Sequence, residues 1–456
     1  MVFMTTSTES RALAPGNTPR LGDLAGAAAA DRNRAVDAYR AGAMIAVALG
    51  HWAAVAVGTD ANGELWAGNA LEYAPGMAWL TWLFQVMPLF FVVGGFASAM
   101  SLDSHIAQGR RTCDWVAQRL RRMMAPAVVL AAVWTGVIGL GVVAGQASLV
   151  IAAAFAAAIP LWFLANYTID TALAPHVLLR FRRHPVGVPA LLVGAFVAIE
   201  LIRLAGVPVL PQLNWVLGWL IFQVLGFAWR DGLLPSGRAV CALSIGFLGA
   251  AVTAVAVGPW PVAMVHFPGL AHSPTQPPTI ALLLFGFGYS GLAIAAAPRV
   301  TAALAGDGRG SKAAWRAAVA ANAIAMSVYL WHMTAAVVGS VVLWSLGLLP
   351  TASVGSPLWW FQKIPVFIVS FLALAAIVSA VCGHERRALL SPPVRWRGGT
   401  GSVLATAALI SLSVKLWAGG SLPQLSAGLV GVLAVWMVVL RGLPKAPAAL
   451  ISEVRS

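Results

Sequence analysis

Apolar segments of about 20 residues recur along almost the whole chain, and a helix needs this length to cross the hydrocarbon core of a bilayer. Sixty per cent of the 456 residues are hydrophobic, and only 10% are charged. We therefore expect an all-α polytopic membrane protein with about 12 transmembrane helices. The expected spans are roughly 41–57, 79–101, 124–144, 160–179, 187–205, 213–229, 239–257, 280–298, 319–346, 360–383, 402–417 and 424–441.

The basic residues are distributed unevenly about these spans. With a cytoplasmic N-terminus, the cytoplasmic segments carry all of the 29 Lys and Arg residues except Arg203, Lys363 and Lys415, which lie in or beside spans. Because orientation follows basic residues in short loops, we expect a multi-pass protein of the plasma (inner) membrane with both termini cytoplasmic. The net charge of +14 then reflects topology, and the expected partner of the basic face is membrane lipid, not nucleic acid.

We divide the chain into a disordered cytoplasmic tail (1–35), a membrane core (36–383) and a C-terminal accessory helical pair with its tail (384–456). The tail has no apolar core followed by a cleavage site, so we do not expect a cleaved signal. A crossing by the apolar stretch 145–159 would place the Arg180–Arg183 cluster outside. We therefore expect 149–158 to form a re-entrant or outer-surface helix. The three cysteines indicate neither a disulfide framework nor a metal site.

The first expected span carries three polar side chains on one stripe. Arg40 and His51 are 11 positions apart, which is about three helical turns and a rise of about 16 Å. Asp37 lies about 40° from His51 by the same geometry. A charge or an imidazole inside a membrane is costly unless it faces a cavity or a partner, so this stripe is a candidate functional site.

Two further pairs of polar residues lie within expected spans. Asn166 and Asp170 are four residues apart and share a helix face. The Asp170 carboxylate is a candidate to orient His51 or bind an acceptor hydroxyl, or alternatively to pair with Arg203 as a structural bridge. Glu200 and Arg203 are three residues apart, and we favour a structural ion pair between them.

Four short segments in a fixed order carry a resemblance to a known family: DAYRAGAMIAVALGH (37–51), PLFFVVGGF (88–96), RLRR (119–122) and SVYLWH (327–332). Over roughly residues 32–383 the chain resembles the integral-membrane acyltransferase 3 family. Those enzymes move acyl groups, often acetyl, from cytoplasmic acyl-CoA to carbohydrates or lipids on the far side. The family commonly has Ser-Gly-Phe where this chain has Gly94-Gly95-Phe96, which puts a role for that serine in doubt. Its ten-helix core is followed here by the C-terminal pair.

The resemblance suggests roles for the polar residues. His51 is the expected catalytic base, because an imidazole suits removal of a hydroxyl proton near neutral pH. Arg40, oriented by Asp37, is expected to meet the phosphate or pantetheine region of the donor. Arg119 and Arg122 are three residues apart on a helix, and two guanidiniums so placed can grip the phosphates of coenzyme A.

The remaining candidates are expected to line a common cavity. Tyr329 and His332 share a helix face at mid-depth and resemble a late family element. Together with Asn166 and Asp170 they are expected to surround His51. If acyl crosses the membrane, this cavity opens to the cytoplasm past Arg40 and Arg119 and toward the outer loops 58–78 and 258–279.

We therefore predict a membrane-embedded acyl-CoA-dependent O-acyltransferase. The expected donor is acetyl-CoA, no metal is expected, and the expected acceptor is a hydroxyl of an envelope saccharide or glycolipid. The rival is a secondary transporter or lipid flippase that uses intramembrane acids and histidines. A scaffold without chemistry is the third alternative. The sequence leaves open the acceptor, the acyl chain length, the oligomeric state and whether an acyl-histidine forms.

Overall fold

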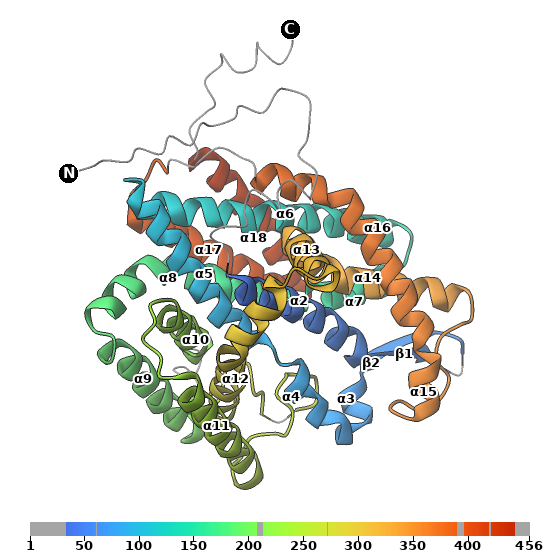
Figure 1. The fold of residues 1–456 in the computed structure, drawn as a ribbon. Coiled ribbons are helices and arrows are strands. Elements are labelled where there is room, and N and C mark those ends of the chain that lie inside the picture. The colour runs from blue at the N-terminus through green and yellow to red at the C-terminus, as the bar shows by residue number, and fades with distance from the viewer. Residues whose placement is uncertain are drawn as a thin grey trace, which may run out of the picture.

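The computed structural model describes residues 33–60, 62–207, 213–270, 272–389, 396–418 and 421–442. Figure 1 shows a molecule built almost entirely of helices, with one small β-hairpin. The antiparallel strands are β1 (Val55–Thr59) and β2 (Leu65–Asn69). The helices are α2 (Arg34–Ala54), α3 (Ala70–Tyr73), η1 (Pro75–Leu80), α4 (Thr81–Phe84), α5 (Met87–Ala107), α6 (Thr112–Val143), α7 (Ala147–Ala158), α8 (Leu161–Arg183), α9 (Gly187–Leu204), α10 (Asn214–Arg230), α11 (Gly237–Val257), α12 (Ile280–Ala305), α13 (Arg309–Ala323), α14 (Ala325–Ser345), α15 (Pro357–Gln362), α16 (Ile364–Leu389), α17 (Thr400–Trp417) and α18 (Leu422–Gly442).

The predicted spans reappear as helices. In the described residues, nine helical stretches are long and apolar enough to cross a membrane. The other predicted spans correspond to α2, which carries charged residues, to α10, which has 17 residues, and to α18. The all-α polytopic fold is confirmed.

Two span boundaries differ from the prediction. The expected span 319–346 is two helices, because α13 ends at Ala323 and α14 begins at Ala325. Helix α13 is amphipathic, with Trp315 and Val319 buried, and it packs against α2. The first expected span reaches residue 57, whereas α2 ends at Ala54 and the chain continues into the β-hairpin.

The ambiguous stretch before the fourth span forms a separate helix, α7. Its 12 residues make a rod about 18 Å long, too short for a hydrocarbon core of about 30 Å. Together with α8 it forms one long apolar helical stretch, Ala147–Arg183, and its re-entrant or outer-surface position stays a prediction.

Helices α5 and α10 cross with their backbones in contact. A Cβ atom built on Gly95 would lie 2.1 Å from the carbonyl oxygen of Gln223, and one built on Gly226 would lie 2.0 Å from that of Val92. Small residues allow such close approach between membrane helices. The glycines of the 88–96 segment therefore fix the position of α5, which packs against α2.

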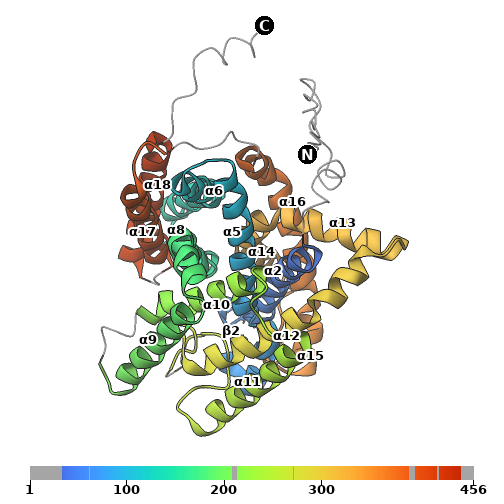
Figure 2. The same cartoon turned by 60° about the vertical axis from the view of Figure 1, so that its left-hand side comes forward.

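The C-terminal pair packs directly on the core. Helix α17 lies against α8 and α18 against α6, as both views show (Figures 1 and 2). The Trp396 N–H donates to the Asp114 carboxylate at 2.7 Å, and Arg111 donates to both Asp114 and the Trp396 carbonyl. The pair thus covers the helix that carries Asp170. Helix α16 continues to Leu389, past the predicted domain boundary at 383.

Candidate active site

Helix α2 carries His51 in its last turn. Its N-terminus is capped by Asn33, whose side chain accepts from the Val36 N–H at 3.1 Å. The helix packs against α5, α12, α13 and α14, and Figure 2 shows it enclosed among them. Because these helices cover one side of α2, that side can carry polar groups that would be costly against lipid.

His51 and His332 form a direct pair. The Nδ1 atom of His51 lies 2.9 Å from Nε2 of His332, and the two rings stack with centroids 5.0 Å apart. His332 is fully buried, and its Nδ1 lies 2.7 Å from the carbonyl oxygen of Tyr329. The Trp52 indole donates to the His332 carbonyl at 2.9 Å. His51 and Trp52 of α2 therefore both form hydrogen bonds with His332 of α14.

These contacts assign the tautomers of the two neutral rings. A carbonyl oxygen only accepts, so Nδ1 of His332 carries its proton and Nε2 of His332 is an acceptor. His51 must then donate from Nδ1, which leaves the lone pair on its Nε2 available. The pair therefore prepares His51 to take up a proton at Nε2, as a general base does.

A row of aromatic rings leads from this pair to the arginine helix. The Tyr329 hydroxyl donates to the Pro160 carbonyl, and its ring centroid lies 5.2 Å from that of Phe163. Phe163 in turn stacks on Tyr167 with centroids 5.2 Å apart. The Tyr167 hydroxyl is a hydrogen-bond partner of Arg119.

Three arginines gather where this row ends. Arg119 donates to Ser101 Oγ at 2.6 Å, and its guanidinium lies 4.5 Å from the centre of the Trp115 ring. Arg40 and Arg122 are close enough for their charges to repel that of Arg119. The groups that Arg119 contacts on Ser101, Trp115 and Tyr167 are uncharged. Like charges brought together in this way favour binding of an anion such as a phosphate.

The other predicted residues have different surroundings. Asn166 and Asp170 are fully buried, and in the described part of the chain their side-chain N and O atoms have no hydrogen-bond partner. Arg203 pairs with Glu200 at 2.7 Å, as expected for the structural pair, and not with Asp170. The main-chain carbonyl of Asp37 accepts from the Asn322 amide at 2.8 Å.

The sequence reasoning missed Tyr167, which lies between Asn166 and Asp170. A Cβ atom on Gly94 would lie 3.0 Å from the Tyr167 ring and 3.3 Å from its hydroxyl oxygen. The phenol thus approaches the place where a serine at position 94 would project its side chain. The sequence signal for Tyr167 was Gly94, which stands where the family commonly has serine. In a packed interior, the absence of a side chain at one position leaves room for the side chain of another residue.

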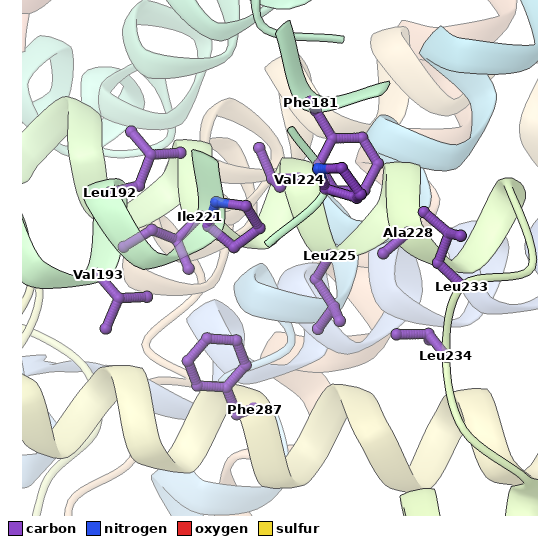
Figure 3. Close-up of a pocket in the computed structure, with 12 residues that line it drawn as sticks. Phe181, Leu192, Val193, Ile221, Val224, Leu225, Ala228, Leu233, Leu234 and Phe287 are labelled. Atoms are coloured by element: carbon purple, nitrogen blue, oxygen red, sulfur yellow. The ribbon is translucent and has the colours of Figure 1, made fainter. Parts of the chain in front are cut away.

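An apolar pocket of about 250 Å³ lies elsewhere, between α8, α9, α10 and α12. Figure 3 shows Phe181, Leu192, Ile221 and Phe287 around it. None of the predicted site residues lines this pocket. It is therefore distinct from the region that contains the histidine pair and the arginines.

Comparison with known families gives one match. The model of a family described as an acyltransferase domain matches residues 33–384, which is most of the chain. No curated protein and no solved structure matches. The matched region contains His51, Arg119 and His332, which lie on α2, α6 and α14. The chain belongs to the acyltransferase 3 family of integral-membrane proteins.

Proposed function

We propose that the protein is an acyl-CoA-dependent O-acyltransferase in which His51 is the general base. The observation that carries this proposal is the hydrogen bond between His51 and His332. It assigns the Nδ1 proton and leaves Nε2 of His51 unprotonated. His332 is then a positioning residue, which holds the His51 ring and stabilises the imidazolium that forms during transfer.

The reaction follows from this arrangement. The acceptor hydroxyl gives its proton to His51 Nε2 as its oxygen attacks the thioester carbonyl. The tetrahedral intermediate collapses, the bond from carbon to sulfur breaks, and the thiolate of coenzyme A takes the proton from the imidazolium. The products are an ester and the free thiol. An acyl-histidine route would place the same Nε2 as the nucleophile.

The arginine cluster supports a coenzyme A donor. Arg40, Arg119 and Arg122 present guanidiniums suited to a diphosphate and a ribose phosphate. The α2 helix rises about 16 Å between the levels of Arg40 and His51. A pantetheine arm is long enough to reach from phosphates held at the first level to a thioester at the second.

The acceptor would approach from the opposite end of α2. The β-hairpin follows α2 directly, at the end away from Arg40. We propose that both termini are cytoplasmic, that the membrane is the plasma membrane, and that the acceptor is a saccharide or glycolipid of the envelope. We further propose acetyl as the transferred group.

Transfer of radiolabelled acetyl from acetyl-CoA in isolated membranes tests the proposal. Wild-type protein should form labelled, base-labile ester, and His51→Ala should form none at equal protein level. The control His176→Ala alters a histidine of α8 away from the pair and should retain activity. Full activity of His51→Ala would refute the catalytic assignment. Uptake of a labelled solute without any labelled ester would favour the transporter.

A further inference from the structure

Lys363 lies at the junction of α15 and α16, and its side chain is buried against the end of α2. The residue is 1% exposed. Its Nζ atom donates to the Ala53 carbonyl at 2.7 Å and to the Val55 carbonyl at 2.5 Å. Burial of an ammonium group in an apolar interior is costly without compensation.

The carbonyls that Lys363 binds lie where α2 stops. The last backbone hydrogen bond of the helix runs from the Val55 N–H to the His51 carbonyl. The carbonyls that follow have no partner within the helix, and the helix dipole makes this end negative. A cation that donates two hydrogen bonds here pairs with these carbonyls, and its charge is favourable at the negative end of the dipole.

Aromatic rings complete the surroundings of the ammonium. Nζ lies 4.2 Å from the centre of the Trp359 ring, 5.4 Å from that of Trp360 and 5.9 Å from that of Phe367. Such contacts stabilise a desolvated cation. Phe367 also packs edge-on against Trp52, with centroids 6.3 Å apart. Lys363 therefore bonds to the carbonyls on either side of Ala54, the last residue of α2, and Phe367 of α16 packs on the same turn.

This final turn is the one that presents His51. Ala53 is two residues beyond His51, and Trp52 is bonded to His332. We propose that Lys363 is a positioning residue for the His51 and His332 pair: it fixes the end of α2, and thereby the depth and rotation of the His51 ring. The inference rests on the proposed role of His51 as the base.

Two substitutions at Lys363 and one control test this role. Lys363→Met keeps an unbranched apolar side chain of slightly shorter length but removes the charge and the donors, and Lys363→Gln removes the charge but keeps one donor group. Lys415→Met is the matched control, because Lys415 also lies over an aromatic ring, 4.1 Å from the centre of Trp215, but on α17. All variants are purified as the full chain.

Hydrogen exchange of the amides in 50–57, followed by mass spectrometry, needs no substrate. Lys363→Met should speed exchange there, and Lys415→Met should not. Steady-state kinetics should show kcat reduced about 10- to 100-fold with KM for acetyl-CoA within about twofold, because a small misplacement of a base slows chemistry more than donor binding. Lys363→Gln should recover part of kcat.

Unchanged exchange at 50–57 in Lys363→Met would overturn the proposal, as would faster exchange with unchanged kcat. If Lys363→Met does not fold, the same two measurements on Lys363→Gln decide between these outcomes. If the wild-type protein transfers no acyl group, the proposed function fails. The exchange experiment then still decides whether Lys363 holds the end of α2.

Discussion

The Nδ1 atom of His51 lies 2.9 Å from Nε2 of His332, although the two residues are 281 positions apart in the chain. His332 is fixed in turn by the Tyr329 carbonyl. Since the first histidine must donate to the second, removal of His332 frees the His51 ring to rotate and to change tautomer. With His51 as the proposed base, the pair would link the activity of the protein to the position of α14.

His332→Ala should lower kcat on the order of 10²-fold and leave KM for acyl-CoA almost unchanged. The loss should be smaller than that in His51→Ala, because the base itself remains and only its orientation is lost. Single-turnover and steady-state transfer assays measure both parameters. An equal loss in the two variants would instead give both imidazoles a direct part in the chemistry.

The double variant Arg119→Ala/Arg122→Ala should weaken acyl-CoA binding about 10²- to 10⁴-fold, since each lost hydrogen bond to a charged group is worth about 1.5–3 kcal/mol and two are removed. The matched control is Arg180→Ala/Arg183→Ala, a second arginine pair with the same spacing, on the last turn of α8. Titration of acyl-CoA into purified protein gives both affinities. Equal losses of acyl-CoA affinity in the two double variants would mean that the arginines of 119–122 do not bind the donor and serve only to orient the chain in the membrane.

Tyr167→Phe should raise KM for acyl-CoA about 2- to 10-fold, because it removes the hydroxyl that meets Arg119 but keeps the ring. Gly94→Leu should raise it further, since the new side chain would displace the phenol. Gly136→Leu is the control, as a Cβ atom there meets nothing within 4 Å. Unchanged KM in both test variants would remove Tyr167 from the donor site.

The sequence predicted helix positions well, because bilayer thickness imposes a length on apolar segments. Hydropathy did not predict where a helix ends when an apolar run continues past that end into another conformation. The run Val55–Val57 extends the hydrophobicity of α2, but its β-branched residues enter a strand. Similarly, the apolar residues around Ile324 continue from α13 into α14, and nothing in their hydropathy marks the end of a surface helix.

The candidate site was predicted in its parts but not in its contacts. His51 and His332 were each singled out as polar groups in apolar helices, yet no sequence pattern gives the relative rotation of two helices. Asp170 was considered as a partner of His51, whereas the structure gives that place to His332. Tyr167 was missed because a phenol on an apolar helix resembles a packing residue.

Gly95→Ala should destabilise the protein, although alanine is the better helix former by about 1 kcal/mol. The added Cβ would lie 2.1 Å from the Gln223 carbonyl oxygen, which belongs to the backbone and cannot rotate away. Overpacking of this kind costs about 1–3 kcal/mol, and separation of α5 from α10 should bring the cost to the upper part of that range. Gly246→Ala on α11 is the control, because nothing lies within 4 Å of its Cβ position. Thermal unfolding in detergent should show a lower Tm for Gly95→Ala and an equal or higher Tm for Gly246→Ala. An unchanged Tm in Gly95→Ala would mean that α5 and α10 do not touch at this crossing, and the placement of α5 beside α2 would need revision.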